Sequence, residues 1–499
     1  MDKTRTPVLI GAAQLTHRKK TKEQIDPVDF MAKVSRIALK DATLDDSYAI
    51  DTIYVVNCLS KHLTSPCEDL AEKLNMTPST TGYTGIGGSA PQWFVNLAAE
   101  NIYSGKSELV LICGAESFYT HENIHHFKDA LSRVINETKT TSASRYIGDI
   151  RNPNTDLETD YALTLPVQTY SLFENALRGH WGKNMKEHMD ELSLFCSNFS
   201  SIASENPFSW SKKALSPEAI ATINDNNQMV AFPYTKSMCA NMSVNQAAAV
   251  IMTNLAKAES MGVPKDKIIF LLGYAAAEDN FYVSQRPELW ASPSVTEAVD
   301  HALMQIPLSI DHIKYFDFYS CFPCVPRIVR EMLNMSPNDP RPLTITGGLP
   351  YFGGPGNNYT LHAICTMVDT LRKEPDEYGL IQTISWFLSK HVIGIYSATP
   401  GNTAWQPSRH EKKEPYPLVH VVKELNGKAT IESFILLYDH TNTPCAATVV
   451  GRDTHLNRFI ARVKAESGIL AHMASEETVG TSGTVQYDSK TACNWFYFK

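Results

Sequence analysis

The sequence predicts a mixed α/β protein, in which helices cover a sheet, followed by a small β-rich domain. Short apolar runs alternate with segments of helical period, and this order favours buried parallel strands joined by helices. A change of texture after residue 417, to short β-type runs separated by turn residues, predicts the added domain. The 499 residues also exceed the size at which one core usually suffices, so more than one domain is expected.

The first half contains three runs that are short, apolar and typical of buried strands, at 8–13, 53–56 and 109–113. Between the last two, residues 89–104 have the apolar spacing of a helix, and Gly105 stands where a left-handed residue ends one. From 118 to 232 the pattern loosens, and we expect a cap over a site, with a helix at 187–199.

A second unit repeats this order without obvious sequence identity, which predicts two similar α/β halves. The strand pattern returns at 247–252 and 268–272, and the second unit then opens with an expected helix at 295–304, a strand at 313–318 and a helix at 325–333. The predicted domains are therefore 1–270, which includes the cap, then 271–405, and finally 415–499.

Prolines and charges mark 401–417 as a linker between domains. Beyond it, we expect a small antiparallel sheet or barrel built from 419–422, 430–437, 446–450 and 459–463. The Ser/Thr/Gly-rich tail after Met473 is predicted to be partly disordered up to the aromatic residues 495–498.

Composition limits the classes of function. A net charge of −8 and a pI near 6.1 give no broad basic surface, so nucleic acid is not an expected partner. No apolar run reaches the roughly 18 residues that a membrane span needs, and no signal peptide is recognised, so we expect a cytoplasmic protein without a membrane span. The ten scattered cysteines are then expected to be reduced thiols.

Four glycine-rich or polar segments follow one another along the chain. They are Gly87-Gly88-Ser89-Ala90-Pro91-Gln92, the run 241–249 beginning Asn241-Met242-Ser243, Tyr319-Ser320-Cys321-Phe322, and the run 347–355 ending Gly353-Gly354-Pro355. Together and in this order they resemble the motifs of the thiolase superfamily. The sequence is most similar to the type 1 thiolase-like proteins, often labelled acetyl-CoA acetyltransferases, which carry an additional C-terminal β-rich domain.

The resemblance implies a thiolase fold of two similar halves in five layers, α-β-α-β-α, plus the small C-terminal β domain. It also implies acyl-CoA or CoA as ligand, with no permanently bound cofactor and no metal. The residues that it assigns to substrate binding are Ser89, Asn241, Ser243, Tyr319, Phe322, Gly348, Gly353, Gly354 and Pro355. Oligomeric state stays open between a monomer and a homodimer.

The same resemblance indicates that the residues of thiolase chemistry are replaced. The position of the nucleophilic Cys is Gly87, the activating His falls on Gly354, and the second Cys falls near Ser385. Without a side chain to acylate, the covalent step is lost. We therefore predict an acyl-CoA-binding member of the acetyl-CoA acetyltransferase family, in lipid metabolism, that lacks ordinary thiolase activity.

Two other functions remain open from the residues. One is a non-catalytic scaffold or partner-binding protein, and the other is an acyltransferase or hydrolase that uses Cys321 or His391 as catalytic residue. Cys321 and Cys324 form a Cys-X-X-Cys at a predicted helix start, where the pKa of a thiol can be lowered. Ser89 is expected to be the N-cap of its helix rather than a nucleophile.

Overall fold

A computed structural model describes residues 2–19, 24–45, 48–120, 146–149, 151–401, 403–408 and 416–499. Its largest sheet has nine strands in the order β3-β2-β4-β7-β1-β8-β11-β10-β9. The strands of the first half are β1 (Pro7–Thr16), β2 (Thr52–Val55), β3 (Thr80–Tyr83), β4 (Leu109–Ser117) and β7 (Asn245–Asn254). Those of the second half are β8 (Ile269–Glu278), β9 (Tyr315–Phe318), β10 (Tyr378–Ser385) and β11 (Lys390–Ser397).

The two halves share one strand order. Outward from the centre, β1, β7, β4 and β2 in the first half correspond to β8, β11, β10 and β9 in the second. Only two residue pairs, Val8 with Phe270 and Leu9 with Ile269, join β1 to β8. This repetition confirms the prediction of two similar α/β halves.

The expectation of a parallel sheet is correct only at its flanks. Strands β2, β3 and β4 run parallel, as do β9 and β10, but β1, β7, β8 and β11 pair antiparallel at the centre. The antiparallel pairing results from the point at which the chain re-enters the sheet after the cap. Strand β7 begins at Asn245 beside Ser117, the last residue of β4, so it must run back along that strand.

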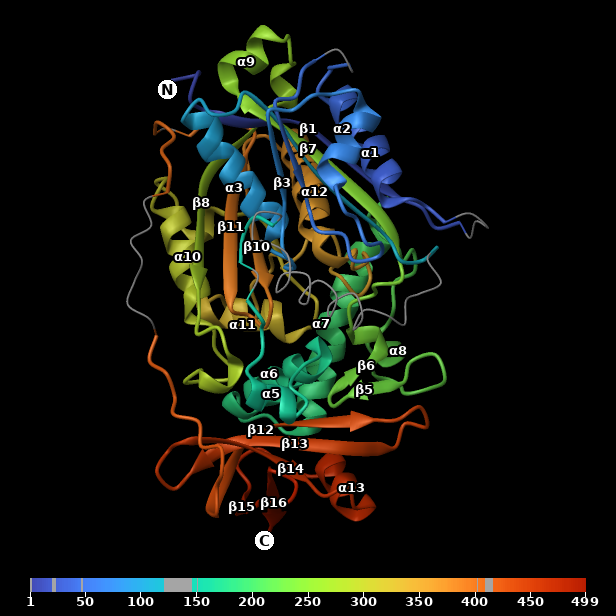
Figure 1. The fold of residues 1–499 in the computed structure, drawn as a ribbon, viewed down its shortest axis with the longest axis vertical. Coiled ribbons are helices and arrows are strands. Elements are labelled where there is room, and N and C mark those ends of the chain that lie inside the picture. The colour runs from blue at the N-terminus through green and yellow to red at the C-terminus, as the bar shows by residue number, and fades with distance from the viewer. Residues whose placement is uncertain are drawn as a thin grey trace.

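Five layers result (Figure 1). Helices α3 (Ala90–Tyr103) and α12 (Tyr359–Lys373) lie between the two halves and contact strands of both. Helices α1 (Pro27–Asp41) and α2 (Pro66–Leu74) cover the first half from outside, while α10 (Pro293–Leu303) and α11 (Cys324–Met332) cover the second. The predicted helix at 89–104 and its terminal Gly105, with φ of 72°, are confirmed.

The cap is helical and lies between the two α/β halves and the C-terminal domain. It comprises α5 (Asp156–Asp160), α6 (Pro166–His180), α7 (Met185–Glu205), α8 (Pro217–Ala221), β5 (Met229–Ala231) and β6 (Tyr234–Thr235). Part of the predicted cap, 121–145, lies outside the described residues. Helix α9 (Leu255–Ser260) follows β7, and short 3-10 helices lie at Lys236–Met238, Lys265–Lys267, Val283–Gln285, Ile310–His312 and Gly356–Asn358.

The C-terminal domain is a closed barrel. Strands β12 (Gly427–Tyr438), β13 (Pro444–Asp453), β14 (Arg458–Val463), β15 (Ser482–Asp488) and β16 (Cys493–Phe498) follow the order β13-β14-β16-β15-β12, and pairing of β12 with β13 closes the ring. Helix α13 (Ser467–Ser475) lies between β14 and β15 in the chain. Strand β5 of the cap pairs with β12, so the barrel is continuous with the cap.

Two expectations for this domain are wrong. Residues 419–422 form no strand, and only Val421 makes a single bridge, to Arg458. The tail after Met473 is not disordered but forms the paired strands β15 and β16. Val485 and Phe496 from these strands are buried in the barrel core, and this apolar burial stabilises a segment whose composition is otherwise polar.

Candidate functional site

The four motif segments meet around one apolar cavity of about 330 Å³. Gly87 and Gly88 come from the turn before α3, and Tyr319, Cys321 and Phe322 come from the loop after β9. The second segment contributes Met242, and Ala240 lies just before this segment. The fourth segment contributes Leu349 and Gly354. Helix α6 of the cap forms a further wall through Leu165, Pro166, Val167 and Tyr170.

Not every predicted binding residue reaches this cavity. Tyr319, Phe322 and Gly354 line it, whereas Ser89 lines a neighbouring pocket. Asn241, Ser243, Gly348, Gly353 and Pro355 belong to the segments that surround the cavity but are not among its lining residues. Asn241 instead positions the fourth segment, because its carbonyl oxygen accepts a hydrogen bond of 2.8 Å from the Gly354 nitrogen.

Gly87 is packed tightly against the β10 end. A Cβ on Gly87 would lie 2.2 Å from Ser385 Oγ, so a side chain does not fit there without a shift. Ser385 Oγ is 2.5 Å from Ser89 Oγ and accepts a hydrogen bond of 3.2 Å from the Ser89 nitrogen. Gly87 and Ser385 stand near the two positions that the resemblance assigns to thiolase cysteines. They are far apart in the chain, and the structure brings them together.

The expectation that Ser89 caps its helix is wrong in one respect. Ser89 occupies the N-cap position of α3, but its side chain makes no capping hydrogen bond. Its φ and ψ of −81° and −9° are already helical, whereas a capping residue is usually extended. The hydroxyl is held by Ser385 instead.

Gly354 has different surroundings. A Cβ on Gly354 would lie 3.4 Å from the Asn241 carbonyl oxygen and 3.5 Å from Ala240 Cβ, which is ordinary van der Waals contact. The neighbouring Gly353 is constrained, because its φ is 119° and a Cβ on it would lie only 2.4 Å from Gln246 Oε1. The fourth segment thus requires glycine at 353 but has space for a Cβ at 354.

Cys321 lines the cavity, but its thiol is not activated. Burial raises the pKa of Cys321 to about 12, opposite to the lowering expected for a Cys-X-X-Cys at a helix start. The reason is that α11 begins only at Cys324, so Cys321 is not at the helix start, and burial outweighs the hydrogen bonds from Tyr170 and the backbone that lower this pKa. Burial likewise raises the pKa of Cys324 well above its ordinary value.

His391 lies on β11 with both ring nitrogens in hydrogen bonds inside the chain. Ser292 Oγ is 2.7 Å from Nε2, and Gln382 Nε2 is 3.0 Å from Nδ1. Because the Gln382 amide nitrogen can only donate, Nδ1 accepts, and Nε2 carries the proton and donates to Ser292. Burial, followed by the charge of Arg286, lowers the pKa of His391 to about 3. Cys321 and His391 are not brought together, since His391 does not line the cavity that contains Cys321.

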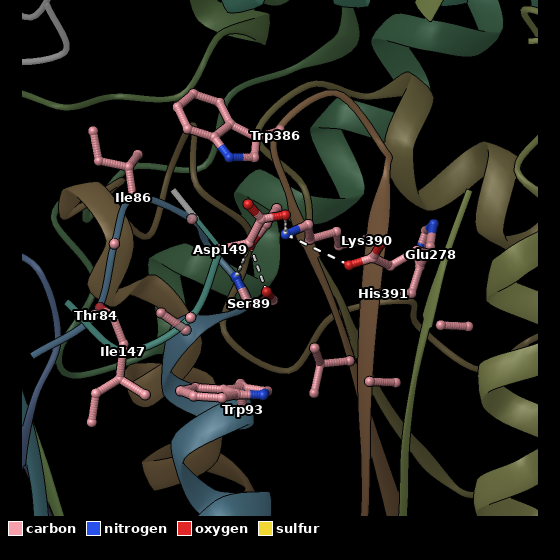
Figure 2. Close-up of a pocket in the computed structure, with 18 residues that line it drawn as sticks. Thr84, Ile86, Ser89, Trp93, Ile147, Asp149, Glu278, Trp386, Lys390 and His391 are labelled. Carbon is pink, nitrogen blue, oxygen red and sulfur yellow. Dashed lines mark hydrogen bonds and ion pairs between the residues drawn. The ribbon is translucent and has the colours of Figure 1, made fainter. Parts of the chain in front are cut away.

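A second pocket, of about 200 Å³, adjoins the first and shares Ile86, Gly87 and Trp386 with it (Figure 2). Ser89, Ser385 and His391 line it, together with Trp93. The Lys390 ammonium in this pocket forms ion pairs with Asp149 and Glu278. Burial raises the pKa of Asp149, but hydrogen bonds from Arg151 and Lys390 outweigh this and hold the pKa well below its ordinary value.

Sequence reasoning missed Trp386, which lines both pockets, and the charged group of Asp149, Glu278 and Lys390. Trp386 has φ of 53° at the turn between β10 and β11, a conformation that no local sequence signal predicts for tryptophan. The three charged residues come from separate segments and meet only in the folded chain. Among the described residues, no cluster of His, Cys, Asp or Glu side chains could hold a metal ion.

Comparison with known proteins gives a family match for the C-terminal domain and a structural match for nearly the whole chain. A family model described as the thiolase-like protein type 1 additional C-terminal domain matches residues 411–490. A monomeric SCP2-thiolase-like protein type 1 from Mycobacterium smegmatis is 26% identical, with a TM-score of 0.84 and 99% of each chain covered. A search of curated proteins by sequence finds no match.

Two further solved structures share the fold at lower identity. Acetyl-CoA acetyltransferase from Syntrophomonas wolfei is 16% identical, and human mitochondrial 3-ketoacyl-CoA thiolase is 13% identical. Each has a TM-score of 0.58 and covers 79% of this chain, with 99% of its own length matched. The chain therefore has the thiolase fold and carries the additional C-terminal domain of type 1 thiolase-like proteins.

Proposed function

We propose that this protein binds an acyl-CoA thioester in the apolar cavity and does not form the acyl-enzyme of a thiolase. The observation that carries the proposal is the cavity itself, where all four thiolase-like segments meet around Gly87. Its volume of about 330 Å³ lies within the range of small-molecule sites. Gly87 offers no atom that an acyl group could join.

Two features of the cavity support an acyl ligand rather than a strongly polar one. Leu165, Val167 and Phe322 form walls that would remove an acyl chain from water. The charged side chains Asp149, Glu278 and Lys390 lie in the neighbouring pocket, and with Arg151 they form ion pairs between two carboxylates and two cations. An apolar cavity beside a charged pocket suits a thioester whose acyl chain lies in the cavity and whose large polar part lies outside it.

Calorimetric titration with acetyl-CoA, acetoacetyl-CoA and free CoA tests this function. We expect saturable binding of the thioesters, and Val167→Trp, which fills the cavity, should weaken it at least about tenfold, or about 1.4 kcal/mol. Leu418→Trp is the matched control, because Leu418 is 63% exposed and lies outside the cavity. No heat at millimolar ligand would refute the proposal and favour the alternative of a non-catalytic scaffold.

Acyl transfer through Cys321 is a competing candidate, because Cys321 lines the same cavity. A thiol with a pKa of about 12 is almost entirely protonated at neutral pH and is a poor nucleophile. We therefore expect the intact mass of the protein to be unchanged after incubation with acetyl-CoA. A gain of one acyl group that is lost in Cys321→Ala would establish the transferase or hydrolase instead.

A monomer forms part of the proposal. The similar Mycobacterium smegmatis protein is monomeric. In this chain the segment 146–149 covers part of the outer edge of β3, where the Ile147 nitrogen donates a hydrogen bond of 2.8 Å to the Tyr83 carbonyl oxygen. Light scattering after size exclusion should give one chain per particle, and a mass of two chains would contradict this. No helix in the described part of the chain is long and apolar enough to span a membrane, and the cytoplasmic location stays a prediction.

A further inference from the structure

Helix α6 contacts the cavity near its N-terminal end and the C-terminal barrel further along its length. Its first turn supplies the wall residues Pro166, Val167 and Tyr170. Tyr170 also stacks on Phe322, and its hydroxyl donates a hydrogen bond of 2.6 Å to the Trp386 carbonyl oxygen. A tilt of α6 would therefore move the wall that covers Cys321.

Residues further along α6 are held by the barrel. Ser433 Oγ on β12 donates to the Leu172 carbonyl oxygen at 2.5 Å, and Asn175 Nδ2 donates to the Phe434 carbonyl oxygen at 3.1 Å. Leu172, Asn175 and Arg178 are spaced by three residues, so they form a stripe along one face of the helix. Figure 1 shows β12 running beneath α6 and its neighbours.

The end of this stripe carries a charge. The Arg178 guanidinium is 1% exposed and forms an ion pair with Glu477, which follows α13; Nη2 is 2.9 Å from Oε1. Next to it, Gly179 lies so close to the barrel that a Cβ would be 2.7 Å from Val479 Cγ1. The Glu477 side chain is 48% exposed, but its removal would leave the buried Arg178 guanidinium without this carboxylate, so Glu477 anchors the barrel to α6.

We propose that the C-terminal barrel is a clamp that holds α6 closed over the cavity, so that loosening the contact between barrel and helix opens the cavity and exposes Cys321. The added domain then has a mechanical role at the site, independent of which ligand occupies the cavity. This proposal is independent of acyl-CoA binding, because its evidence is the contacts of α6 with the cavity and with the barrel.

Alkylation of Cys321 by N-ethylmaleimide, followed by peptide mass spectrometry of the full chain, tests the clamp. In the closed state the Cys321 thiol is only partly exposed and its raised pKa keeps it protonated, so it reacts slowly, and its rate reports how often the wall opens. We expect Glu477→Gln and, separately, Ser433→Ala to speed this reaction about fivefold or more, the factor for roughly 1 kcal/mol. Glu476→Gln and Ser482→Ala are the matched controls, since both residues are exposed and lie in the same domain.

Two other cysteines serve as internal references in this experiment. Cys445 is exposed and should react at one rate in every variant, while Cys113 is fully buried in the large sheet and reports global unfolding. Faster alkylation of Cys321 alone supports the clamp. Equal acceleration of Cys113, or no acceleration of Cys321 in either variant relative to its control, overturns it.

Discussion

Gly87 and Gly354 stand at the two positions where the resemblance to thiolases places a nucleophile and its activating base, yet their surroundings differ. At Gly87 a Cβ would lie 2.2 Å from Ser385 Oγ, whereas at Gly354 the nearest atom would be 3.4 Å away. Packing against Ser385 closes the first position, whereas the second has room for a Cβ. We therefore expect a side chain at position 87 to require repacking and a Cβ at position 354 to require none.

The largest effect is expected within the fourth segment, at Gly347. Its φ is 105°, and a Cβ would lie 2.4 Å from backbone atoms of Ala203 on α7. Gly347→Ala combines backbone strain with a clash against atoms that cannot rotate away, so we expect a loss of about 3 kcal/mol or more. Urea denaturation measures it. A loss below about 1 kcal/mol would contradict the close approach of α7 to this segment.

A pH effect of similar size is expected where the fourth segment ends. A Cβ on Gly356 would lie 2.3 Å from Oε1 of Glu116, a fully buried carboxyl that accepts hydrogen bonds from the Leu59 and Ser60 nitrogens. Burial raises the pKa of Glu116 from 4.5 to about 7. The folded state then binds more protons than the unfolded state between these values, so this contribution to stability is full below pH 4.5 and is lost as pH rises through 7.

The loss should be on the order of 3 kcal/mol. It can be isolated by comparing the free energy of unfolding at pH 5 and pH 8 for the natural chain and for Glu116→Gln. The variant should show a smaller decrease. The same decrease in both proteins would mean that Glu116 is ionised in the folded state.

Gly87→Cys should have an intermediate effect and tests the closed position directly. We expect it to destabilise the fold by about 1–3 kcal/mol, because the new side chain forces Ser385 to move. Ser385→Ala removes the nearest atom, so the double variant should recover about 1 kcal/mol relative to the sum of the single changes. Strictly additive losses would show that the two residues do not touch.

The smallest effect is expected at the open position. Gly354→Ala meets only ordinary contacts, so the free energy of unfolding should stay within about 0.5 kcal/mol of that of the natural chain. The same denaturation series measures this change. A loss as large as that of Gly87→Cys would remove the contrast between the two glycines.

Much of this molecule could be predicted from its sequence. Apolar runs located most strands of the large sheet, and the four segments marked the walls of the cavity. The contrast between Gly87 and Gly354 could not be predicted, because it depends on Ser385 and Asn241, which are distant in the chain from the glycines that they approach. In the sequence, Gly87 and Gly354 are both glycines within glycine-rich segments, and nothing distinguishes their packing.

Other structural features that the sequence did not predict have similar physical causes. The centre of the sheet is antiparallel because β7 starts beside the end of β4, a consequence of where the cap returns. The polar tail folds because Val485 and Phe496 enter a closed barrel, although their neighbours are hydrophilic. The wall formed by α6 depends on tertiary contacts with β12, which composition and periodicity do not reveal.

The central claim, binding of an acyl-CoA without a covalent step, is tested most directly by a crystal structure of the protein soaked with acetoacetyl-CoA. We expect an intact thioester whose acyl part lies beneath α6, between Gly87 and Gly354, with no bond to the chain. Electron density that joins the acyl group to Cys321 or another side chain, or a cavity left empty at saturating ligand, would contradict it.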